Sequence, residues 1–203
     1  MNRKMSPDEI GKQYDLTVQA FEQARSASYG LDYLQRFIAL LPPRPRVLEI
    51  GCGTGVPLSR QLVASGAGLF AIDISEKMLE IARANVPAAG YLRANIVDWA
   101  GNGRYDGIFA WDSLFHIPLE RQRQTVHKAL NWLRPGGVAM FTVGGRRGEI
   151  VSSMFGRSFY YSSLSAAEYE EAVQSAGCRL LFSEIDDPSG GGHRVVCCQK
   201  ANV

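Results

Sequence analysis

The chain has 203 residues, of which 46% are hydrophobic, enough for one core around a single sheet. Its formal net charge of +2, with both signs evenly mixed, argues against the basic stripe that binds nucleic acid. No apolar run approaches the roughly 20 residues of a membrane span, and the start lacks the apolar segment of a signal peptide. We therefore expect a cytoplasmic protein with reduced thiols, no membrane partner and, since its 4 cysteines suit no metal spacing, no metal.

The first 41 residues predict two amphipathic helices, which we expect to form an N-terminal helical cap. Ser6 is placed to cap the first helix, with Pro7 at its first helical position. Apolar residues then recur at helical spacing as far as Phe21. The second helix ends before Pro42, which cannot continue it. The apolar stripe of the first helix fits both a packing arm and a lid over a ligand.

The stretch from Arg46 to Ser59, RVLEIGCGTGVPLS, predicts a buried strand, a tight turn and a helix. Gly51, Gly53 and Gly55 allow backbone conformations that other residues avoid. A ligand is therefore expected against the bare backbone of this turn.

The spacing of the glycines indicates which ligand the turn takes. A dinucleotide fingerprint counted from Gly51 requires glycine where Val56 stands. A phosphate-binding Walker loop requires a lysine that is absent here. Glu49, on the strand just before the turn, would repel a pyrophosphate and attract a ligand that carries positive charge. We therefore expect a cationic or zwitterionic ligand.

The next strands place polar residues at the same sheet edge. A strand over residues 69–72 delivers Asp73, whose two carboxylate oxygens suit the adjacent hydroxyls of a ribose. Ser75 is placed to cap the helix that follows. A fourth strand, residues 105–110, is apolar throughout and is expected beside the first strand at the sheet centre. Its carboxyl end, at Trp111 and Asp112, is where ligands of such sheets bind.

The rest of the chain predicts the second half of the sheet and a cover. A helix over residues 119–133 is followed by the breaker LRPGG and a buried strand over 138–143. Residues 144–163 are rich in glycine, serine and aromatic side chains, so we expect an irregular segment over the substrate. The last expected elements are a helix over 165–176 and an antiparallel pair of strands over 179–185 and 194–199.

Five stretches resemble the successive motifs of the class I S-adenosylmethionine-dependent methyltransferases, in particular the small-molecule enzymes, and cover roughly residues 40 to 145. They are VLEIGCGTG, LFAIDIS, RANIVDW, YDGIFAWDSLFHI and LRPGGVAMFTV. The resemblance implies an α/β fold with a Rossmann-like, doubly wound, seven-stranded sheet, mostly parallel with an antiparallel C-terminal strand and helices on both faces. It implies a single domain over 1–203, with the cap at 1–41, a cofactor-binding core at 42–143, and the substrate cover with the C-terminal strand pair at 144–203.

The resemblance also implies S-adenosylmethionine as the cofactor. The segment YDLTVQAF resembles the part of the family that closes over it. Ile74 and Met78 would lie beside the adenine, with the amide of Asn95 and the backbone N–H of Ile96 as its hydrogen-bond partners. Asn95 stands where the family commonly has aspartate. The cofactor-binding residues implied are Tyr14, Glu49, Gly51, Cys52, Gly53, Gly55, Asp73, Ile74, Met78, Asn95, Ile96, Trp111 and Asp112.

Methyl transfer from a sulfonium requires alignment and exclusion of water, and a base only where the acceptor must lose a proton. His116 follows the fourth strand, so we expect it near the methyl group as that base, with a role as a hydrogen-bonded wall residue as the alternative. His127 is expected on a helix facing solvent or core, and His193 in a distal glycine-rich loop.

The expected partner is a compact, partly apolar small-molecule acceptor that the sequence does not identify, bound by a monomer or a homodimer. Two other classes of function stay open. An NAD(P)-binding Rossmann oxidoreductase would share the sheet and Asp73, although Val56 and Glu49 argue against it. A non-catalytic S-adenosylmethionine-binding partner protein would keep the glycine turn and have no acceptor pocket.

Overall fold

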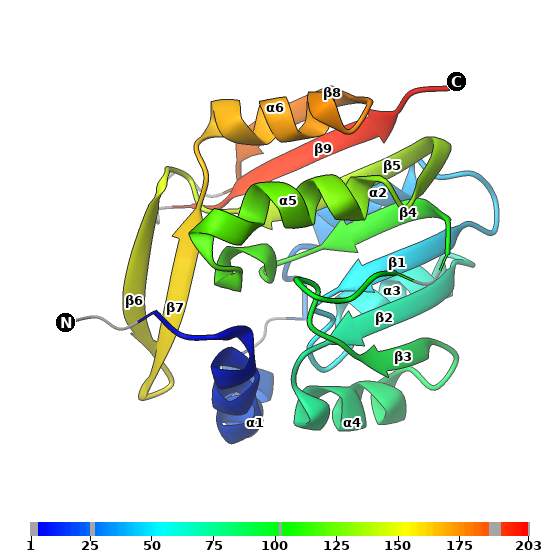
Figure 1. Ribbon diagram of the computed structural model, residues 1–203. Helices are drawn as coiled ribbons and strands as arrows, with labels where there is room; N and C mark the ends of the chain where they lie inside the picture. The colour runs from blue at the N-terminus through cyan, green and yellow to red at the C-terminus, as the bar shows by residue number, and fades with distance from the viewer. Residues whose placement is uncertain (1–3, 25–26, 102, 187–191, 203) are drawn as a thin grey trace.

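The computed structural model describes residues 4–24, 27–101, 103–186 and 192–202 (Figure 1). A seven-stranded sheet with the order β3-β2-β1-β4-β5-β9-β8 forms the centre, and a two-stranded hairpin, β6-β7, stands beside it. The strands are β1 (Arg46–Ile50), β2 (Gly68–Asp73), β3 (Gly90–Arg93), β4 (Tyr105–Ala110), β5 (Leu133–Val143), β6 (Gly148–Met154), β7 (Arg157–Ser163), β8 (Cys178–Ile185) and β9 (Arg194–Lys200). The helices are α1 (Pro7–Ala24), α2 (Leu31–Ile38), α3 (Leu58–Ala64), α4 (Glu76–Asn85), η1 (Leu114–His116, a 3₁₀ turn), α5 (Leu119–Leu130) and α6 (Ala166–Ser175).

The sheet has the predicted topology. Strands β1 to β5 pair in parallel, and β9 lies antiparallel between β5 and β8. The first strand of the sheet along the chain is β1, and β2 and β3 are added on one side of it. The chain then crosses back and adds β4 on the other side of β1. This reversal between β1 and β4 opens a crevice at the carboxyl ends of the two strands. The predicted Rossmann-like, doubly wound, mostly parallel sheet is confirmed.

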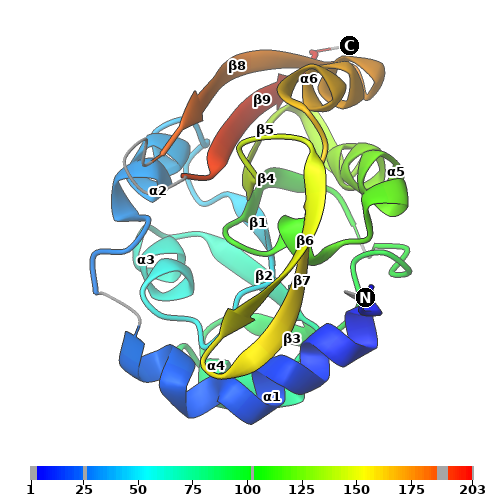
Figure 2. The same cartoon turned by 90° about the vertical axis from the view of Figure 1, so that its left-hand side faces the viewer.

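Alternating side chains of the central strands supply the two faces of the core. Val47 and Phe109 face one cluster, which includes Leu34 and Phe37 of α2. Leu48 faces the opposite cluster, which includes residues of α5 and α6. Figure 2 shows α2 and α3 on one side of the sheet and α5 and α6 on the other. Helix α2 therefore covers one face of the sheet. The predicted division into a cap, a cofactor-binding core and a C-terminal part, with boundaries at residues 41 and 143, stays a prediction.

Residues 144–163, expected to be irregular, form the hairpin β6-β7, with residues paired from Gly148 with Ser163 to Met154 with Arg157. Phe155 and Gly156 both have positive φ, at 52° and 73°, which is the backbone of a tight two-residue hairpin turn. The strand expected at residue 138 begins at Leu133, so LRPGG is part of β5 and pairs with the start of β4 across a register shift.

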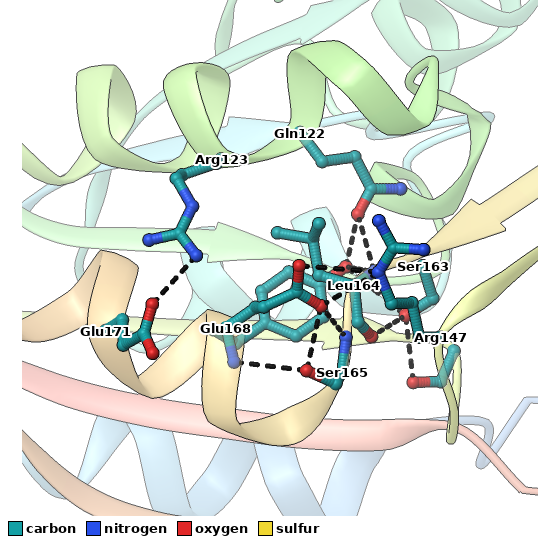
Figure 3. Close-up of polar contacts among 10 residues, drawn as sticks. Gln122, Arg123, Arg147, Ser163, Leu164, Ser165, Glu168 and Glu171 are labelled. Atoms are coloured by element: carbon teal, nitrogen blue, oxygen red, sulfur yellow. Dashed lines mark hydrogen bonds and ion pairs between the residues drawn. The ribbon is translucent and has the colours of Figure 1, made fainter.

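A buried polar network holds the base of the hairpin. Gln122 of α5 is 1% exposed, and its Nε2 donates to the carbonyl and the hydroxyl of Ser162, both at 2.7 Å. Its Oε1 accepts from the hydroxyl of Tyr169 and from the N–H of Leu164 (Figure 3). The hairpin is thereby fixed to both α5 and α6.

Helix α1 and the hairpin cross the side of the molecule where β1, β2 and β4 end (Figure 2). Ser6 and Glu9 form reciprocal hydrogen bonds at the start of α1, as the predicted cap requires. Ile10 of α1 packs with Phe159 and Tyr160 of β7. The two elements therefore contact each other over the crevice.

Candidate functional site

A cavity of about 500 Å³ lies at the carboxyl ends of the central strands, beneath α1 and the tip of the hairpin. Most of the predicted site residues line it. They are Tyr14, Gly51, Gly53, Asp73, Ile74, Met78, Asn95, Ile96, Trp111, Asp112 and His116. Their binding of a cofactor stays a prediction, but the fold brings them to one space from five separate parts of the chain between α1 and η1.

Asp73 and the glycine turn form one bonded unit at the end of β2. The N–H of Gly53 donates to Oδ2 of Asp73 at 2.8 Å, and the N–H of Ser75 donates to Oδ1 at 2.9 Å. Burial raises the pKa of Asp73 above its ordinary value of 3.8, while these backbone donors oppose the rise. Each carboxylate oxygen has a second lone pair, so Asp73 can accept two further hydrogen bonds from a ligand that enters the cavity.

Three predicted contact residues, in the turn or just before it, are not among the described residues that line the cavity. Glu49 is 2% exposed and accepts a hydrogen bond from Ser59 at 2.5 Å. Burial raises the pKa of the Cys52 thiol well above its ordinary range. A side chain at Gly55, whose φ is +78°, would meet α4.

Gly51 has a packing role beside the predicted one. A Cβ there would lie 2.3 Å from the Cβ of Ser113, so the bare backbone makes room for the chain that leaves β4. A Cβ at Gly53 would meet only the ring of Phe21, 3.5 Å away. Both glycines line the cavity, and at Gly53, whose φ is +55°, the bare backbone faces it without a close backbone neighbour.

The loop after β3 is held in place by hydrogen bonds that the sequence did not indicate. Asn95 accepts from the N–H of Val97 at 3.0 Å and donates to Asp98 at 2.7 Å, so its amide also closes its own turn. Lys128 of α5 donates to the carbonyls of Ile96, Val97 and Trp99 at 2.8 to 2.9 Å. These carbonyls all accept from one ammonium, which fixes the wall of the cavity at Ile96.

Helix α1 is bonded to both walls of the cavity. The hydroxyl of Tyr14 lies 2.8 Å from Nε2 of His116. On the opposite wall, Asp15 accepts from the hydroxyl of Ser75 at 2.5 Å and from the N–H of Lys77 at 3.1 Å. Neighbouring residues of one helix turn thus fasten α1 to η1 and to the start of α4.

Both ring nitrogens of His116 are engaged. Nδ1 lies 2.8 Å from the carbonyl oxygen of Tyr160, which can only accept, so Nδ1 carries the proton and Nε2 accepts from Tyr14. Burial lowers the pKa of His116 to about 4, so the ring is neutral at physiological pH. The assignment of His116 as a base stays a prediction, and in this geometry it would act through the hydroxyl of Tyr14.

His193, expected in a distal loop, lines the cavity. Its Nδ1 lies 3.1 Å from Oδ1 of Asp112, and the same carboxylate accepts from the hydroxyl of Tyr29. The hydrogen bond to Asp112 raises the pKa of His193 above 6.5, against an opposing effect of burial. The position of His193 could have been predicted from the antiparallel direction of the last strand. Arg194, the first residue of β9, pairs with Val143, the last residue of β5. A histidine just before β9 must lie at the edge where β4 and β5 end.

The indole N–H of Trp111 is a buried donor that a ligand with an acceptor group could satisfy. It is 5% exposed and lines the cavity, and its Nε1–H has no hydrogen-bond partner among the described residues. A buried donor without a partner costs about 1 to 3 kcal/mol, which an acceptor such as a ligand carboxylate would recover. The wall at Trp111 therefore offers a donor for a ligand acceptor group such as a carboxylate.

Within the described ranges, no group of three or more His, Cys, Asp or Glu side chains could hold a metal ion. The helices of the described residues are each too short or too polar to cross a membrane.

Known proteins resemble the chain in both sequence and fold. A family model described as a methyltransferase domain matches residues 47–137. The ubiquinone biosynthesis O-methyltransferase of Aromatoleum aromaticum is 32% identical over 155 residues, which cover 70% of this chain and 64% of that protein. The chain spans less than two thirds of the length of the curated relatives it matches.

Two solved structures share the fold over nearly the whole chain. The complex of DhpI with S-adenosylhomocysteine has a TM-score of 0.76 at 22% identity and covers 97% of this chain and 98% of its own. The [4+2]-cyclase SpnF has a TM-score of 0.75 at 17% identity and covers 98% of each chain. The second shows that this fold also hosts another kind of chemistry.

The predicted motifs, the strand order and the matched methyltransferase domain agree. Residues 47–137 match a methyltransferase domain, and over this part the chain is similar to the class I S-adenosylmethionine-dependent methyltransferases, the family whose cofactor is S-adenosylmethionine.

Proposed function

We propose that this protein transfers a methyl group from S-adenosylmethionine to a small-molecule acceptor by in-line displacement. The observation that carries the proposal is the single cavity, which joins the glycine turn and Asp73 at one end to an aromatic wall at the other. Phe115, Tyr161 and His193 belong to that wall. One space can therefore take a nucleoside and a second, partly apolar compound.

The residues of the chain have distinct parts in this proposal. When bound, S-adenosylmethionine supplies a methyl group on positively charged sulfur. Asp73 accepts hydrogen bonds from the ribose, and the backbone at Gly53 allows close approach. The indole N–H of Trp111 takes an acceptor atom of the amino-acid end. Helix α1 and the hairpin exclude water and align the acceptor, which suits a reaction with an already activated leaving group.

The acceptor is proposed as a compact aromatic or partly apolar molecule. The lining beneath the hairpin supports this, because Met154, Phe155 and Tyr161 contribute apolar surface there. The relative from Aromatoleum aromaticum is named as an O-methyltransferase of ubiquinone biosynthesis, and an oxygen acceptor is consistent with it. The cytoplasmic location, the lack of a nucleic-acid partner, and the monomeric or homodimeric state stay predictions.

Binding is tested by calorimetric titration and thermal unfolding with S-adenosylmethionine, S-adenosylhomocysteine, NAD and NADP. We expect both sulfur cofactors to bind and to stabilise the fold by about 2.7 kcal/mol at a hundredfold excess over the dissociation constant. The nicotinamide cofactors should do neither. A shift with NAD and none with the sulfur cofactors would support an oxidoreductase instead.

Catalysis is tested separately, because binding alone fits a non-catalytic partner protein or a cyclase. S-adenosylmethionine labelled in the methyl group is incubated with the protein and a set of small phenols, amines and thiols. We expect label in an acceptor together with an equal amount of S-adenosylhomocysteine. Tight binding of S-adenosylmethionine without transfer to any member of the set would argue for the non-catalytic alternative.

A further inference from the structure

His193 and Asp112 form a hydrogen-bonded pair at the acceptor end of the cavity. Nδ1 of His193 lies 3.1 Å from Oδ1 of Asp112, and a carboxylate can only accept, so Nδ1 carries the proton. The other ring nitrogen, Nε2, is therefore left as a proton acceptor. The side chain of His193 is 37% exposed and lines the cavity, so a ligand can reach it.

The ring of Phe115 lies between the two histidines of the cavity, with centroids 4.9 Å from His116 and 5.1 Å from His193. The two histidines nevertheless differ in what they can do. His116 has both nitrogens engaged, by Tyr160 and Tyr14. Among the described residues, His193 has its carboxylate partner at Nδ1. Of the two histidines at the cavity, His193 is the one that combines a carboxylate partner with an acceptor nitrogen.

The charges around His193 favour its taking a proton. Asp112, at the end of β4, and Asp186, after β8, lie 3.1 and 3.9 Å from Nδ1. The neighbouring cation, Arg194, donates instead to Ser183 of β8 at 2.9 Å. Both carboxylates stabilise the imidazolium, in agreement with the raised pKa of His193.

Two tyrosines complete the surroundings of the pair. Tyr29 donates its hydroxyl to the other oxygen of Asp112, which fixes the carboxylate. Tyr161 of β7 lines the same end, and burial followed by the charge of Asp112 raises its pKa, so it stays neutral. The pKa of His193 is raised above its ordinary value, so its ring takes up a proton more readily than a free imidazole.

We propose that His193, oriented by Asp112, removes the proton from a hydroxyl group on a compact aromatic acceptor, so that the reaction is an O-methylation. The acceptor oxygen forms its bond to the methyl carbon while the bond from that carbon to sulfur breaks, and the electron pair of that bond stays on sulfur. The hydroxyl proton moves to Nε2 of His193, and Asp112 stabilises the resulting imidazolium. The aromatic rings of Phe115 and Tyr161 hold the acceptor.

This inference rests on the proposed function, so its experiment includes a measurement that needs no turnover. The protein is saturated with S-adenosylhomocysteine and titrated with 4-nitrophenol, whose phenolate is yellow, at a pH where the free probe is neutral. We expect bound probe to show the phenolate spectrum. The three histidines of the chain each receive the same substitution.

His193→Gln should abolish the phenolate spectrum, because the proton acceptor is gone. His116→Gln should retain it, and His127→Gln serves as the matched control, since His127 of α5 contacts Ser175 of α6 and is not among the described residues that line the cavity. The affinity for S-adenosylhomocysteine should be unchanged in His193→Gln. Methyl transfer to 4-nitrophenol should fall about a hundredfold in His193→Gln, and transfer to the matched thiol, 4-nitrothiophenol, should not.

The pH dependence gives an independent reading. We expect the histidine NMR signal of His193 to titrate above 6.5, and Asp186→Asn to lower that midpoint. The rate of O-methylation should fall at acid pH with the same midpoint and move with it in Asp186→Asn.

Several outcomes would overturn the proposal. They are a phenolate spectrum that survives in His193→Gln, a probe that fails to bind the saturated protein, and a probe that binds only as the neutral phenol. Failure of S-adenosylhomocysteine to bind at all would instead contradict the proposed function, and the titration reports that step first.

Discussion

The carboxylate of Asp73 both builds the glycine turn and remains available to a ligand. It accepts from the N–H groups of Gly53 and Ser75, one on each oxygen. A ribose that donated to the remaining lone pairs would share the same charge. Binding at Asp73 and the conformation of the turn are therefore coupled.

Asp73→Ala should weaken S-adenosylmethionine at least tenfold. Each charge-assisted hydrogen bond contributes about 1.5 to 3 kcal/mol, and about 1.4 kcal/mol is a factor of ten. Calorimetry measures the affinity, and Asp32→Asn, an exposed carboxylate of α2, is the control. In the wild type, affinity should also fall on acidification with a midpoint above 3.8, because protonation removes the charge that accepts the ribose hydroxyls. Unchanged affinity in Asp73→Ala would show that the ribose binds elsewhere.

At the scale of elements, the position of the hairpin β6-β7 on the molecule depends on one buried side chain of α5, Gln122. Gln122 satisfies donors and acceptors from β7, α6 and the end of η1, whereas the adjacent Arg123 makes only an exposed ion pair with Glu171 at 2.9 Å (Figure 3). Two consecutive residues thus offer a direct comparison of buried and exposed polar contacts.

Gln122→Ala should lower the free energy of unfolding by about 2 kcal/mol or more, since it leaves several buried polar groups without partners. Arg123→Ala should change it by less than about 1 kcal/mol. Chemical denaturation followed by circular dichroism measures both values. Equal losses in the two variants would contradict the assigned role of Gln122.

Asp15 is expected to hold α1 over the cavity and so to slow the dissociation of a bound cofactor. Asp15→Ala removes the acceptor for Ser75 and Lys77, while Ser75 still caps α4 through the N–H of Met78. We expect S-adenosylhomocysteine to dissociate several-fold faster, as measured by stopped-flow displacement. The neighbouring Leu16, 59% exposed, gives the control Leu16→Ala. Identical dissociation rates in Asp15→Ala and Leu16→Ala would mean that this bond does not hold the helix over the ligand.

The sheet could be predicted from the sequence because its signals are local. The apolar runs of β1 and β4, the glycine turn and the cap at Ser75 each fix their own element. The hairpin could not be recognised by apolar alternation, since β6 is mostly exposed and carries serine on both faces. Its usable signal was Phe155 with Gly156, a two-residue turn between strands of equal length.

The site was predicted less completely, because its remaining parts meet only through the topology. Asp112 and His193 are 81 positions apart, and no local pattern joins them; only the antiparallel direction of β9 brings them together. Lys128 belongs to a helix whose contacts with the loop after β3 depend on how α5 crosses the sheet. Glu49 was placed correctly on its strand, but its hydrogen bond with Ser59 could not be predicted, because that partner comes from α3.

At the scale of the whole molecule, His116 should make stability depend on pH. Its pKa is about 4 in the folded state and 6.5 when unfolded, so between these values the unfolded chain binds more protons. Stability should therefore fall as the pH is lowered from about 6.5 to about 4, by on the order of 3 kcal/mol from this group. Denaturation of wild type and His116→Gln across this range checks it, and an identical slope in both would contradict it.

Helix α1 is fastened to one wall by Tyr14 and to the other by Asp15, so we expect a cofactor bound beneath it to leave after the helix lifts. The same hydrogen bonds of α1 must open for every acceptor. The dissociation rate of S-adenosylhomocysteine is then set by the opening of α1 and not by the acceptor. Acceptors of very different intrinsic reactivity are consequently expected to reach one common maximal rate and to differ mainly in the concentration at which they reach it.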